Sequence, residues 1–544
     1  MRKKGLALLL TAAMVCSLGL AGCGGNSSDT TENGGEATSA SNASDLQVDS
    51  ATDAVSSKDT LTIAMPSDPG TIDMHYSTAY DYVAPFVVNH LLIQEYDANG
   101  TVLPAIGGES LAAEYTYDDD DMGITFTLRD GVTFSNGYAL TSEDVAFSIR
   151  LCSDQSFYQM VDFDNIETAD NTVHVPFLKK DANALYNIGA TIPIYSEQYY
   201  DELNNEAEFF STSAVGTGPY KIVDWVGGDY LDMEANENYF AGAPKIQKLR
   251  LRFITDASVA YMELQNGGVD IVTSPNWTDV DSVLAGAASG IDCWEESSAY
   301  MLQFGMNCSG ALSNLKLRQA VVTAINKDEL AQGAFLGSGE NSYCLVSESL
   351  PGTIDYADSW PYSYDPEKAK ELLKEAGYEP GQLTLTCIVG AGGGPRTDAA
   401  QMIGGYLEAI GVTLEIKEVD IATYASTITD QPESWDFWLR NFGSGIGNAP
   451  SAHDYFATNI PMNCFIDKQD SSAKMLELAS KMGETMDDTE RTAVFKELQD
   501  YYLNECLYSC PLVQQKTYTL VNSGLKNLTK CGQLYWNVRN AYFE

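Results

Sequence analysis

The string GTGPYKIVDWVGGDYLDMEANENYF opens a run at residues 216–272 that decides the fold class of this chain. Residues 221–235 contain two segments rich in strand-forming residues, separated by Gly227 and Gly228, and this pattern predicts a β-hairpin. Residues 248–253 then alternate basic and apolar side chains with a period of two, which predicts a further strand with one buried face.

The string DDDDMGITFTLRDGVTFSNGYALTSEDVAFSIR at residues 118–150 lies toward the N-terminus. It predicts a strand at 124–128, a tight Asp-Gly turn and a returning strand at 132–134. Thr141, followed three residues later by Asp144, predicts a capping box that begins a helix. Strands and helices therefore alternate in this part of the chain.

The second half of the chain continues the alternation. Asp365 predicts the N-cap of a helix with Pro366 in its first position, and Gly377 predicts its end. A long alternation of helices and strands is typical of α/β domains, and we see no internal repeat.

Length and composition limit the class of protein. The chain has 544 residues, of which 44% are hydrophobic and 20% charged, so several folded domains are expected. Acidic residues outnumber basic residues 76 to 31, which gives a formal charge of -45. Because such a surface repels a polyanion, nucleic acid is excluded as an expected partner.

The N-terminus predicts export. Basic residues at 2–4 precede an apolar run that ends in LAGC at residues 20–23, and this ending resembles the lipobox of bacterial lipoproteins. We expect a lipoprotein signal peptide at 1–22, lipidation of Cys23 and a disordered tether at 23–57, which holds the protein on the extracellular face of the membrane. The alternative is an ordinary secretory signal in which Cys23 has no role.

The cysteines and histidines predict no metal site. Of the eleven cysteines, Cys16 leaves with the signal and Cys23 is lipidated, so an odd number remains. There is no C-x-x-C pair, and the four histidines are isolated in sequence. We therefore expect buried or free thiols, no metal and no cofactor. Since no nucleophile or metalloprotease motif occurs, we also expect that the chain is not an enzyme.

The two long strings, together with LRQAVVTAINKDEL at 317–330 and YDPEKAKELLKEAGY at 364–378, resemble the family 5 extracellular solute-binding proteins. This is the dipeptide- and oligopeptide-binding family of ABC importers. The resemblance covers about residues 61–536 and keeps the order of the family's motifs.

The resemblance implies a two-lobed clamp, a periplasmic-binding-protein type II-like α/β fold that closes around a solute. The chain would cross between the lobes near 298–307 and near 507–514. The implied units are a first lobe at 58–302 plus 509–544, an extra subdomain within it at about 82–207, and a second lobe at 303–508.

In relatives, the loop after Trp-Asp in the second lobe carries an aromatic residue and then an aspartate that holds the ammonium group of a peptide. The matching string here is WDFWLRNFGSGIGNAP at 435–450, which places Phe442 at the aromatic position and Gly445 where the aspartate is expected. Either another acid replaces that aspartate, or the ligand lacks the ammonium group.

A second site element is the glycine-rich string GAGGGPRTDAAQMIGG at 390–405, which runs into a helix beginning near Pro395. Some relatives hold a ligand carboxylate with an arginine near this position, which implies that role for Arg396. The alternative is that Arg396 pairs with a surface acid such as Asp398. Four further aromatic residues are candidates for the ligand site, with core packing as the alternative for each: Trp277, Tyr300, Tyr424 and Trp438.

The sequence thus predicts a lipid-anchored, monomeric receptor that captures a solute by closure of two lobes and delivers it to an ABC permease. Peptides are the leading ligand class. A carbohydrate or another non-peptide solute is the alternative, favoured by Gly445 and the tryptophans. A sensory receptor without transport is a further alternative.

Overall fold

A computed structural model describes residues 41–42, 56–71, 82–96, 102–155, 158–204, 209, 215–391, 394–443, 448–531 and 535–544. The predicted signal peptide, Cys23, most of the predicted tether and Gly445 lie outside the described residues. Within the tether, β1 (Ser41–Asn42) pairs in parallel with Trp294 and Glu295, so this dipeptide differs from the expected disorder.

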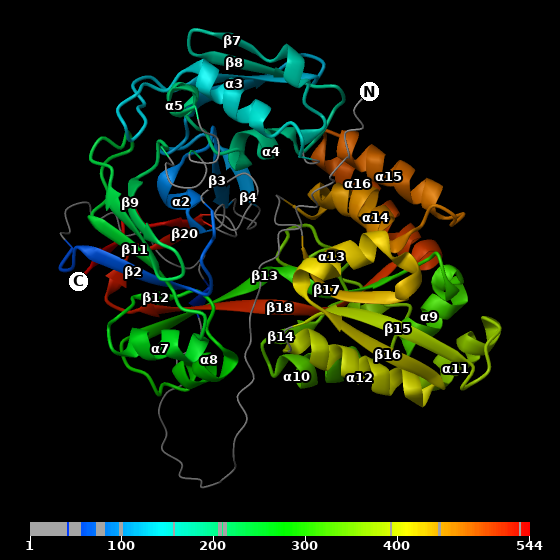
Figure 1. Ribbon diagram of the computed structural model, residues 1–544. Coiled ribbons are helices and arrows are strands. Elements are labelled where there is room, and N and C mark those ends of the chain that lie inside the picture. Colours follow the sequence, from blue (N-terminus) through cyan, green and yellow to red (C-terminus); the bar gives the residue numbers. More distant parts are fainter. Residues whose placement is uncertain are drawn as a thin grey trace.

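One sheet of twelve strands passes through the whole molecule (Figure 1). Its central path is β16 (Val412–Val419), β15 (Leu383–Gly390), β17 (Phe437–Gly443), β13 (Ile291–Met306), β18 (Ser509–Asn522), β12 (Ile271–Val272), β2 (Thr60–Met65), β11 (Lys248–Phe253), β10 (Tyr230–Ala235) and β9 (Tyr220–Val226). Two further strands lie off this path: β1 pairs with β13, and β14 (Gly339–Asn341) pairs with β18.

The sheet repeats one pattern on its two sides. On one side, the parallel strands β11, β2 and β12 are followed by the antiparallel β18. On the other side, the parallel strands β16, β15 and β17 are followed by the antiparallel β13. Because β13 and β18 pair with each other along most of their length, they join the two halves. We keep the names first lobe, second lobe and subdomain for the residue sets predicted above; their boundaries stay a prediction.

The subdomain has its own four-stranded sheet, ordered β5 (Ala112–Tyr117), β6 (Gly123–Leu128), β8 (Thr172–Pro176) and β7 (Glu167–Ala169). Its other elements are α2 (Ala84–Val87), β3 (Ile93–Tyr96), β4 (Val102–Ala105), α3 (Ser142–Leu151), α4 (Ala184–Thr191) and α5 (Glu197–Leu203).

The remaining helices lie in the first and second lobes: α7 (Ala257–Gln265), α8 (Trp277–Leu284), α9 (Leu315–Thr323), α10 (Lys327–Phe335), α11 (Pro366–Glu375), α12 (Pro395–Ala409), α13 (Ile421–Asp430), α14 (Ile460–Cys464), α15 (Ser472–Glu484) and α16 (Asp488–Tyr501). Short strands end the chain: β19 (Leu525–Lys526), β20 (Thr529–Cys531), β21 (Tyr535–Asn537) and β22 (Tyr542–Phe543).

Most local predictions are confirmed, and one is wrong. The hairpin forms as β9 and β10, and the capping box of α3 has both reciprocal hydrogen bonds between Thr141 and Asp144. The predicted return strand at 132–134 does not form, because β6 pairs instead with β5 and β8. Thr133 makes only an isolated bridge to Ala139, so the Asp-Gly turn redirects the chain toward α3 rather than building a hairpin.

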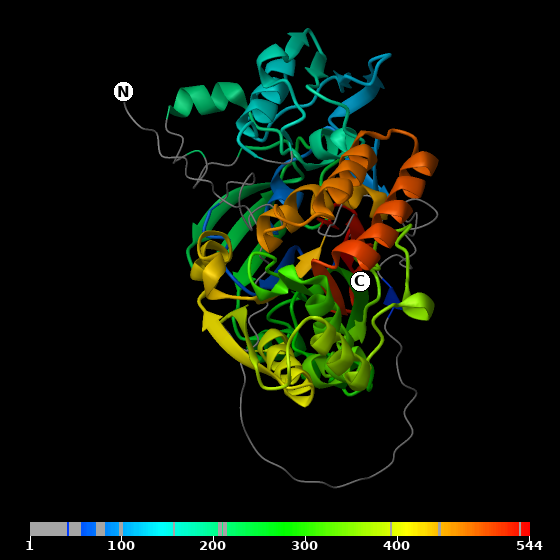
Figure 2. The ribbon, with the colours of Figure 1, turned by 90° about the vertical axis from the view of Figure 1, so that its right-hand side faces the viewer.

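Among the described residues, the buried apolar side chains form four clusters. The largest extends from Leu302 to Val513 and fills the second lobe. The subdomain has a cluster from Leu91 to Ile194, and two further clusters line the two faces of the first lobe's part of the sheet. Figure 2 shows the helices α15 and α16 of the second lobe lying close to the subdomain.

Candidate functional site

The two lobes join where β13 and β18 run side by side. The register of this pair shifts between Ser297 and Met301, and again between Leu302 and Gln303. Pro511 lies in the same stretch of β18 and has no N–H to donate to the ladder. Irregular pairing of this kind increases local twist. The junction is therefore the part of the long sheet with the least regular ladder.

Buried polar side chains surround the junction. The Tyr455 hydroxyl donates to Gln303 Oε1 at 2.7 Å, and it also lies 2.5 Å from Ser509 Oγ. Gln514 Nε2 donates to the Tyr300 carbonyl at 3.3 Å, across the first register shift. These bonds connect β13, β18 and the second lobe, so they fix the two crossing strands relative to each other.

Two of the sequence-predicted residues lie at this junction. Tyr300 is partly exposed on β13, opposite Gly443 of β17. Trp277 begins α8, where Asn276 caps the helix, and its ring lies 5.4 Å from that of Tyr518 on β18.

Two arginines lie close enough to one buried tyrosine of the second lobe to act on its charge. Arg396 lies in the first turn of α12 and Arg440 lies on β17, and both are partly exposed. The Tyr424 hydroxyl donates to the Leu439 carbonyl at 2.9 Å. Burial raises the pKa of Tyr424 above its ordinary value, while the charges of Arg440 and Arg396 both act to lower it. Two guanidinium groups therefore act on one phenol.

The start of α12 adds a polar group to this cluster. The N–H groups of Thr397 and Asp398 bond to the Gly394 carbonyl at 3.0 and 3.1 Å. Among the described residues, the buried hydroxyl of Thr397 has no hydrogen-bond partner. A helix N-terminus, nearby guanidinium groups and an unsatisfied hydroxyl together favour an anion.

Two other predicted residues are buried in the core. Trp438 is 1% exposed, its ring faces Gly305, and its Nε1 donates to the Asn463 carbonyl at 3.0 Å. Tyr424 is 4% exposed. In this arrangement neither side chain presents a surface to a solute, because each is enclosed by the second-lobe cluster. Their role in ligand binding stays a prediction.

For two further predicted residues, the structure leaves the side chain or the whole residue undescribed. Phe442 takes part in β17 through its backbone, opposite Met301, but its side chain is not among those described. Gly445, at the missing aspartate position, falls in the undescribed stretch 444–447.

Arg440 was missed by the sequence reasoning. It lies between Trp438 and Phe442 in a strand, and residues two apart in a strand share a face. Because Trp438 and Phe442 were candidates for other reasons, a period of two applied between them could have added Arg440. The guanidinium carbon of Arg440 lies 4.7 Å from the centre of the Trp438 ring, and this contact depends on the tertiary packing.

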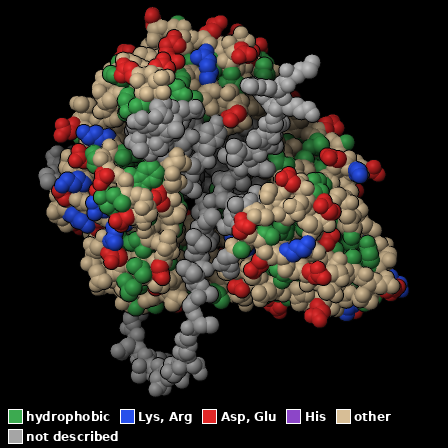
Figure 3. Space-filling view, in the orientation of Figure 1, with side chains coloured by type: hydrophobic (Ala, Val, Ile, Leu, Met, Phe, Trp, Pro, Cys, Tyr) green, Lys and Arg blue, Asp and Glu red, His purple; other side chains and the backbone are tan. Residues whose placement is uncertain are grey.

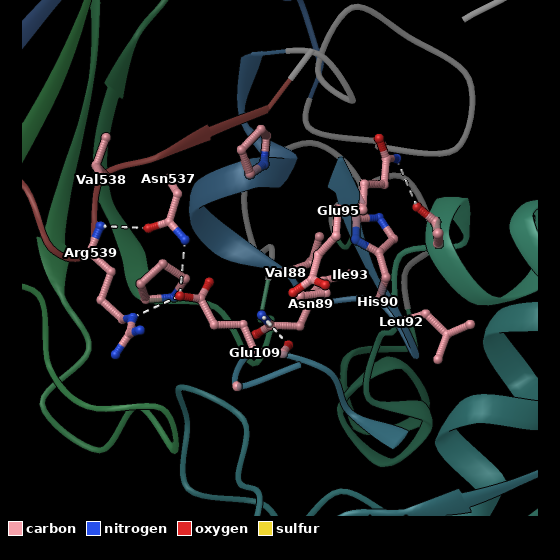
Figure 4. Close-up of a pocket in the computed structure, with 15 residues that line it drawn as sticks. Val88, Asn89, His90, Leu92, Ile93, Glu95, Glu109, Asn537, Val538 and Arg539 are labelled. Atoms are coloured by element: carbon pink, nitrogen blue, oxygen red, sulfur yellow. Dashed lines mark hydrogen bonds and ion pairs between the residues drawn. The ribbon is translucent and has the colours of Figure 1, made fainter. Parts of the chain in front are cut away.

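A separate cavity of about 300 Å³ lies in the first lobe, where α2 and β3 face β21 (Figure 4). Glu109 Oε1 accepts hydrogen bonds there from Arg539 Nε at 2.7 Å and from Asn537 Nδ2 at 3.1 Å. Asn89 Nδ2 donates to the Tyr239 hydroxyl at 2.9 Å. Since these lining groups bond to one another or to neighbouring protein groups, we assign this cavity a structural role.

No described helix is both long enough and apolar enough to cross a membrane. No group of three or more His, Cys, Asp or Glu side chains in the described ranges could hold a metal ion. The eight cysteines whose side chains are described are free and buried, which confirms the expected state of those thiols.

Comparison with known proteins gives one family. The description "Bacterial extracellular solute-binding proteins, family 5 Middle" matches residues 109–463. Heme-binding protein A of Haemophilus influenzae is 29% identical over 334 residues, which are 56% of this chain and 59% of that protein, less than two thirds of its length. Glutathione-binding protein GsiB of Escherichia coli K12 is 26% identical over 483 residues, covering 83% of this chain and 91% of that protein.

Among solved structures, the oligopeptide-binding protein AppA from Bacillus subtilis, in complex with a nonapeptide, matches with a TM-score of 0.74. Its sequence identity is 20%, and the match covers 90% of this chain and 100% of that one. This likeness confirms the predicted fold, an α/β clamp of the type II periplasmic-binding-protein kind.

Proposed function

The chain belongs to the bacterial extracellular solute-binding proteins of family 5, and from this membership we propose that it binds a peptide that carries a free carboxylate between its two lobes. The family is one of binding proteins, so the solute leaves unchanged. The lobes close around it because the solute contacts both lobes only in the closed state.

The observation that carries this proposal is the cluster of Arg396, Arg440 and the N-terminus of α12. The chain has only 31 basic residues against 76 acidic residues, so two guanidinium groups beside one phenol are a local exception. Burying a carboxylate in a closed clamp is costly unless charged or hydrogen-bonding groups match it. The unpartnered Thr397 hydroxyl supplies one further donor among the described residues.

The relatives support a solute of this kind. One relative is named for glutathione, one for heme, and one solved structure holds a nonapeptide. All three ligands carry carboxylate groups. Since Gly445 stands where the ammonium-binding aspartate is expected, we propose that the carboxylate end contributes more to recognition than the amino end.

The cellular role follows from the N-terminus. We propose that Cys23 is lipidated, that residues 24–57 tether the protein to the outer face of the cell membrane, and that the closed, monomeric protein delivers its solute to an ABC permease. The lipobox-like ending LAGC supports the anchor, and the family supports the transport role.

Titration calorimetry of the purified chain tests the ligand class. The probes are a tetrapeptide with free ends, the same peptide N-acetylated or C-amidated, and an oligosaccharide. We expect the amidated form to lose about 2 to 5 kcal/mol and the acetylated form to lose little. Arg396→Ala and Arg440→Ala weaken binding of the free peptide by a similar amount.

The matched control is Arg252→Ala, which removes an arginine paired with Glu263 in the first lobe and leaves the affinity unchanged. Equal affinity for the amidated and free peptides, or binding of the oligosaccharide alone, would contradict the proposal.

A further inference from the structure

A second contact joins the lobes at a distance in sequence from the junction. The Ala182 N–H of the subdomain donates to the Gly483 carbonyl of the second lobe at 2.8 Å. Asn183 Nδ2 donates to the Ser451 carbonyl at 2.8 Å and to His453 Nδ1 at 3.3 Å. The side chain of one asparagine therefore makes two hydrogen bonds to a segment 268 residues further along the chain.

Asn183 forgoes a local role to make this contact. It occupies the N-cap position of α4, where an asparagine side chain commonly accepts a backbone hydrogen bond and contributes about 1 kcal/mol to stability. Its side chain makes no such capping bond. The turn before the helix is closed instead by Asp181, whose Oδ1 accepts from the Asn183 N–H at 2.7 Å. The amide of Asn183 is thus held toward the second lobe.

The partners fix the proton of His453. Because Asn183 Nδ2 can only donate, the imidazole Nδ1 is the acceptor, and the proton of the neutral ring is on Nε2. Nε2 lies 3.5 Å from Asp454 Oδ1 and 4.0 Å from Asp181 Oδ2. Asp181 comes from the subdomain and Asp454 from the second lobe, so the ring sits between carboxylates of both sides.

The contact is buried but polar. Asn183 is 3% exposed and His453 is 7% exposed. Separation of the lobes would return these groups to water, which costs little for polar side chains, whereas exposure of apolar groups opposes opening. Polar interfaces of this kind are typical of contacts that form and break.

Gly483 makes room for this arrangement. It lies within α15, where glycine costs about 1 kcal/mol relative to alanine. A Cβ at this position would lie 2.7 Å from His453 Cδ2 and 2.9 Å from Nε2. Alanine would therefore favour the helix but displace the ring that accepts from Asn183.

The contact lies far from the crossing strands. In Figure 1, α4 and α15 lie in the upper part of the molecule, while β13 and β18 run between the lobes lower down. A rotation about the crossing strands moves this point more than any point near them. Closure would make the contact, and opening would break it.

We propose that Asn183, His453 and Gly483 form a closed-state interlock that holds the lobes together without touching the solute. These residues hold the lobes in position and take no part in binding chemistry. Their role rests on the proposed function only because closure of the lobes serves binding. The interlock sets the ratio of closed to open molecules, with or without a solute.

Double electron–electron resonance on the full chain tests the interlock. Spin labels are attached through p-acetylphenylalanine in place of Glu167 on β7 and Glu490 on α16, which avoids the native cysteines; both positions are exposed. Distances are measured without solute and with a peptide mixture from digested casein. We expect a short-distance population in the wild type, and a closed-to-open ratio about tenfold lower in Asn183→Ala.

Asn165→Ala is the matched control, because it removes an asparagine side chain that bonds only to Asp162 on the exposed side of the subdomain. Gly483→Ala is the second variant; it also lowers the closed population, while its thermal unfolding midpoint stays near that of the wild type. If Asn183→Ala does not fold, Gly483→Ala decides the question.

The proposal is overturned if the closed population is the same in all variants, or if the wild type shows none under either condition. The labels report closure whether or not peptides bind. Failure of every peptide to bind would therefore contradict the proposed function and leave the test of the interlock intact.

Discussion

Both lobes pair basic side chains with acids at the surface, and among the described residues the second lobe also buries basic side chains. In the first lobe, lysines and arginines pair with acids at the surface, and Figure 3 shows them gathered on the left over β9, β10 and β11. In the second lobe, Arg318 is 1% exposed and donates to the Cys506 and Leu312 carbonyls. Lys327 is also buried, donates to the Ser342 carbonyl at 2.8 Å and lies 3.8 Å from the Trp360 ring centre.

The cores differ in the same sense. The second lobe has one large cluster, whereas the first lobe and its subdomain divide their apolar side chains among three. Buried cations bonded to carbonyls connect segments within a single core and are costly to expose. The described core of the second lobe is thus continuous, while the predicted subdomain has a cluster of its own.

Alkaline pH gives the largest expected change in the free energy of unfolding. Burial raises the pKa of seven described thiols, and five of them belong to the second lobe: Cys308, Cys344, Cys387, Cys464 and Cys506, against Cys293 and Cys510 in the first. Well below the ordinary thiol pKa of about 8.5, both states keep these protons, so stability is complete. Above it the unfolded thiols ionise first, and each costs about 1.4 kcal/mol per pH unit until its folded pKa is reached.

Lys327 opposes this trend, because burial lowers its pKa to about 8 and the folded state gains stability as pH rises from there. We still expect a net loss of several kcal/mol by about pH 10.5, measured by urea unfolding with a reducing agent present. Cys387→Ala removes one buried thiol, so the free energy of unfolding falls less steeply with pH by about the contribution of that thiol. A free energy of unfolding that stays constant between pH 8.5 and 10.5 would contradict the prediction.

Gly305→Ala gives the next largest effect. A Cβ at Gly305 on β13 would lie 2.0 Å from the Trp438 ring, and both residues are enclosed where the lobes join. We expect a loss of about 3 kcal/mol, because overpacking a closed core forces a backbone shift.

Gly405→Ala in α12 is the control: a Cβ there has no neighbour within 4 Å, and the helix gains slightly. Urea unfolding measures both variants. If Gly305→Ala is tolerated, the Trp438 ring is free to leave the core, which would favour its predicted role in contacting the solute.

Asp232→Asn gives the smallest effect. Asp232 accepts two hydrogen bonds of 2.6 Å from Arg250 on the neighbouring strand, but the Arg250 side chain is 42% exposed. We expect a loss below about 1 kcal/mol that diminishes further in high salt, because exposed pairs are screened. Urea unfolding at low and high salt measures it. A loss as large as that of Gly305→Ala would show that surface pairs hold the first lobe together.

Local rules predicted much of the fold. The capping box of Thr141, the hairpin at 221–235 and the helix that begins at Pro366 all depend on residues within a few positions of one another. The predicted return strand at 132–134 does not form, because β5 and β8 already pair with both edges of β6. The sequence of a turn does not determine which strand pairs with a given edge of a sheet.

The candidate site was predicted in part. The family resemblance pointed to Arg396 and to the β17 region, and the structure brings Arg396 and Arg440 to one tyrosine. Arg440 was missed although it shares a strand face with Trp438, and the role of Asn183 could not be foreseen, because its sequence position indicates only a helix cap.

The sequence by itself determined the acidic composition, the alternation of helices and strands and the family, because each is written in neighbouring residues or in ordered strings; the export signal stays a prediction. Only the tertiary structure decided that Trp438 is enclosed, that two arginines meet at Tyr424 and that Asn183 bonds to His453. The physical reason is that burial and hydrogen bonding between segments hundreds of residues apart depend on how the lobes pack, which local preference does not specify.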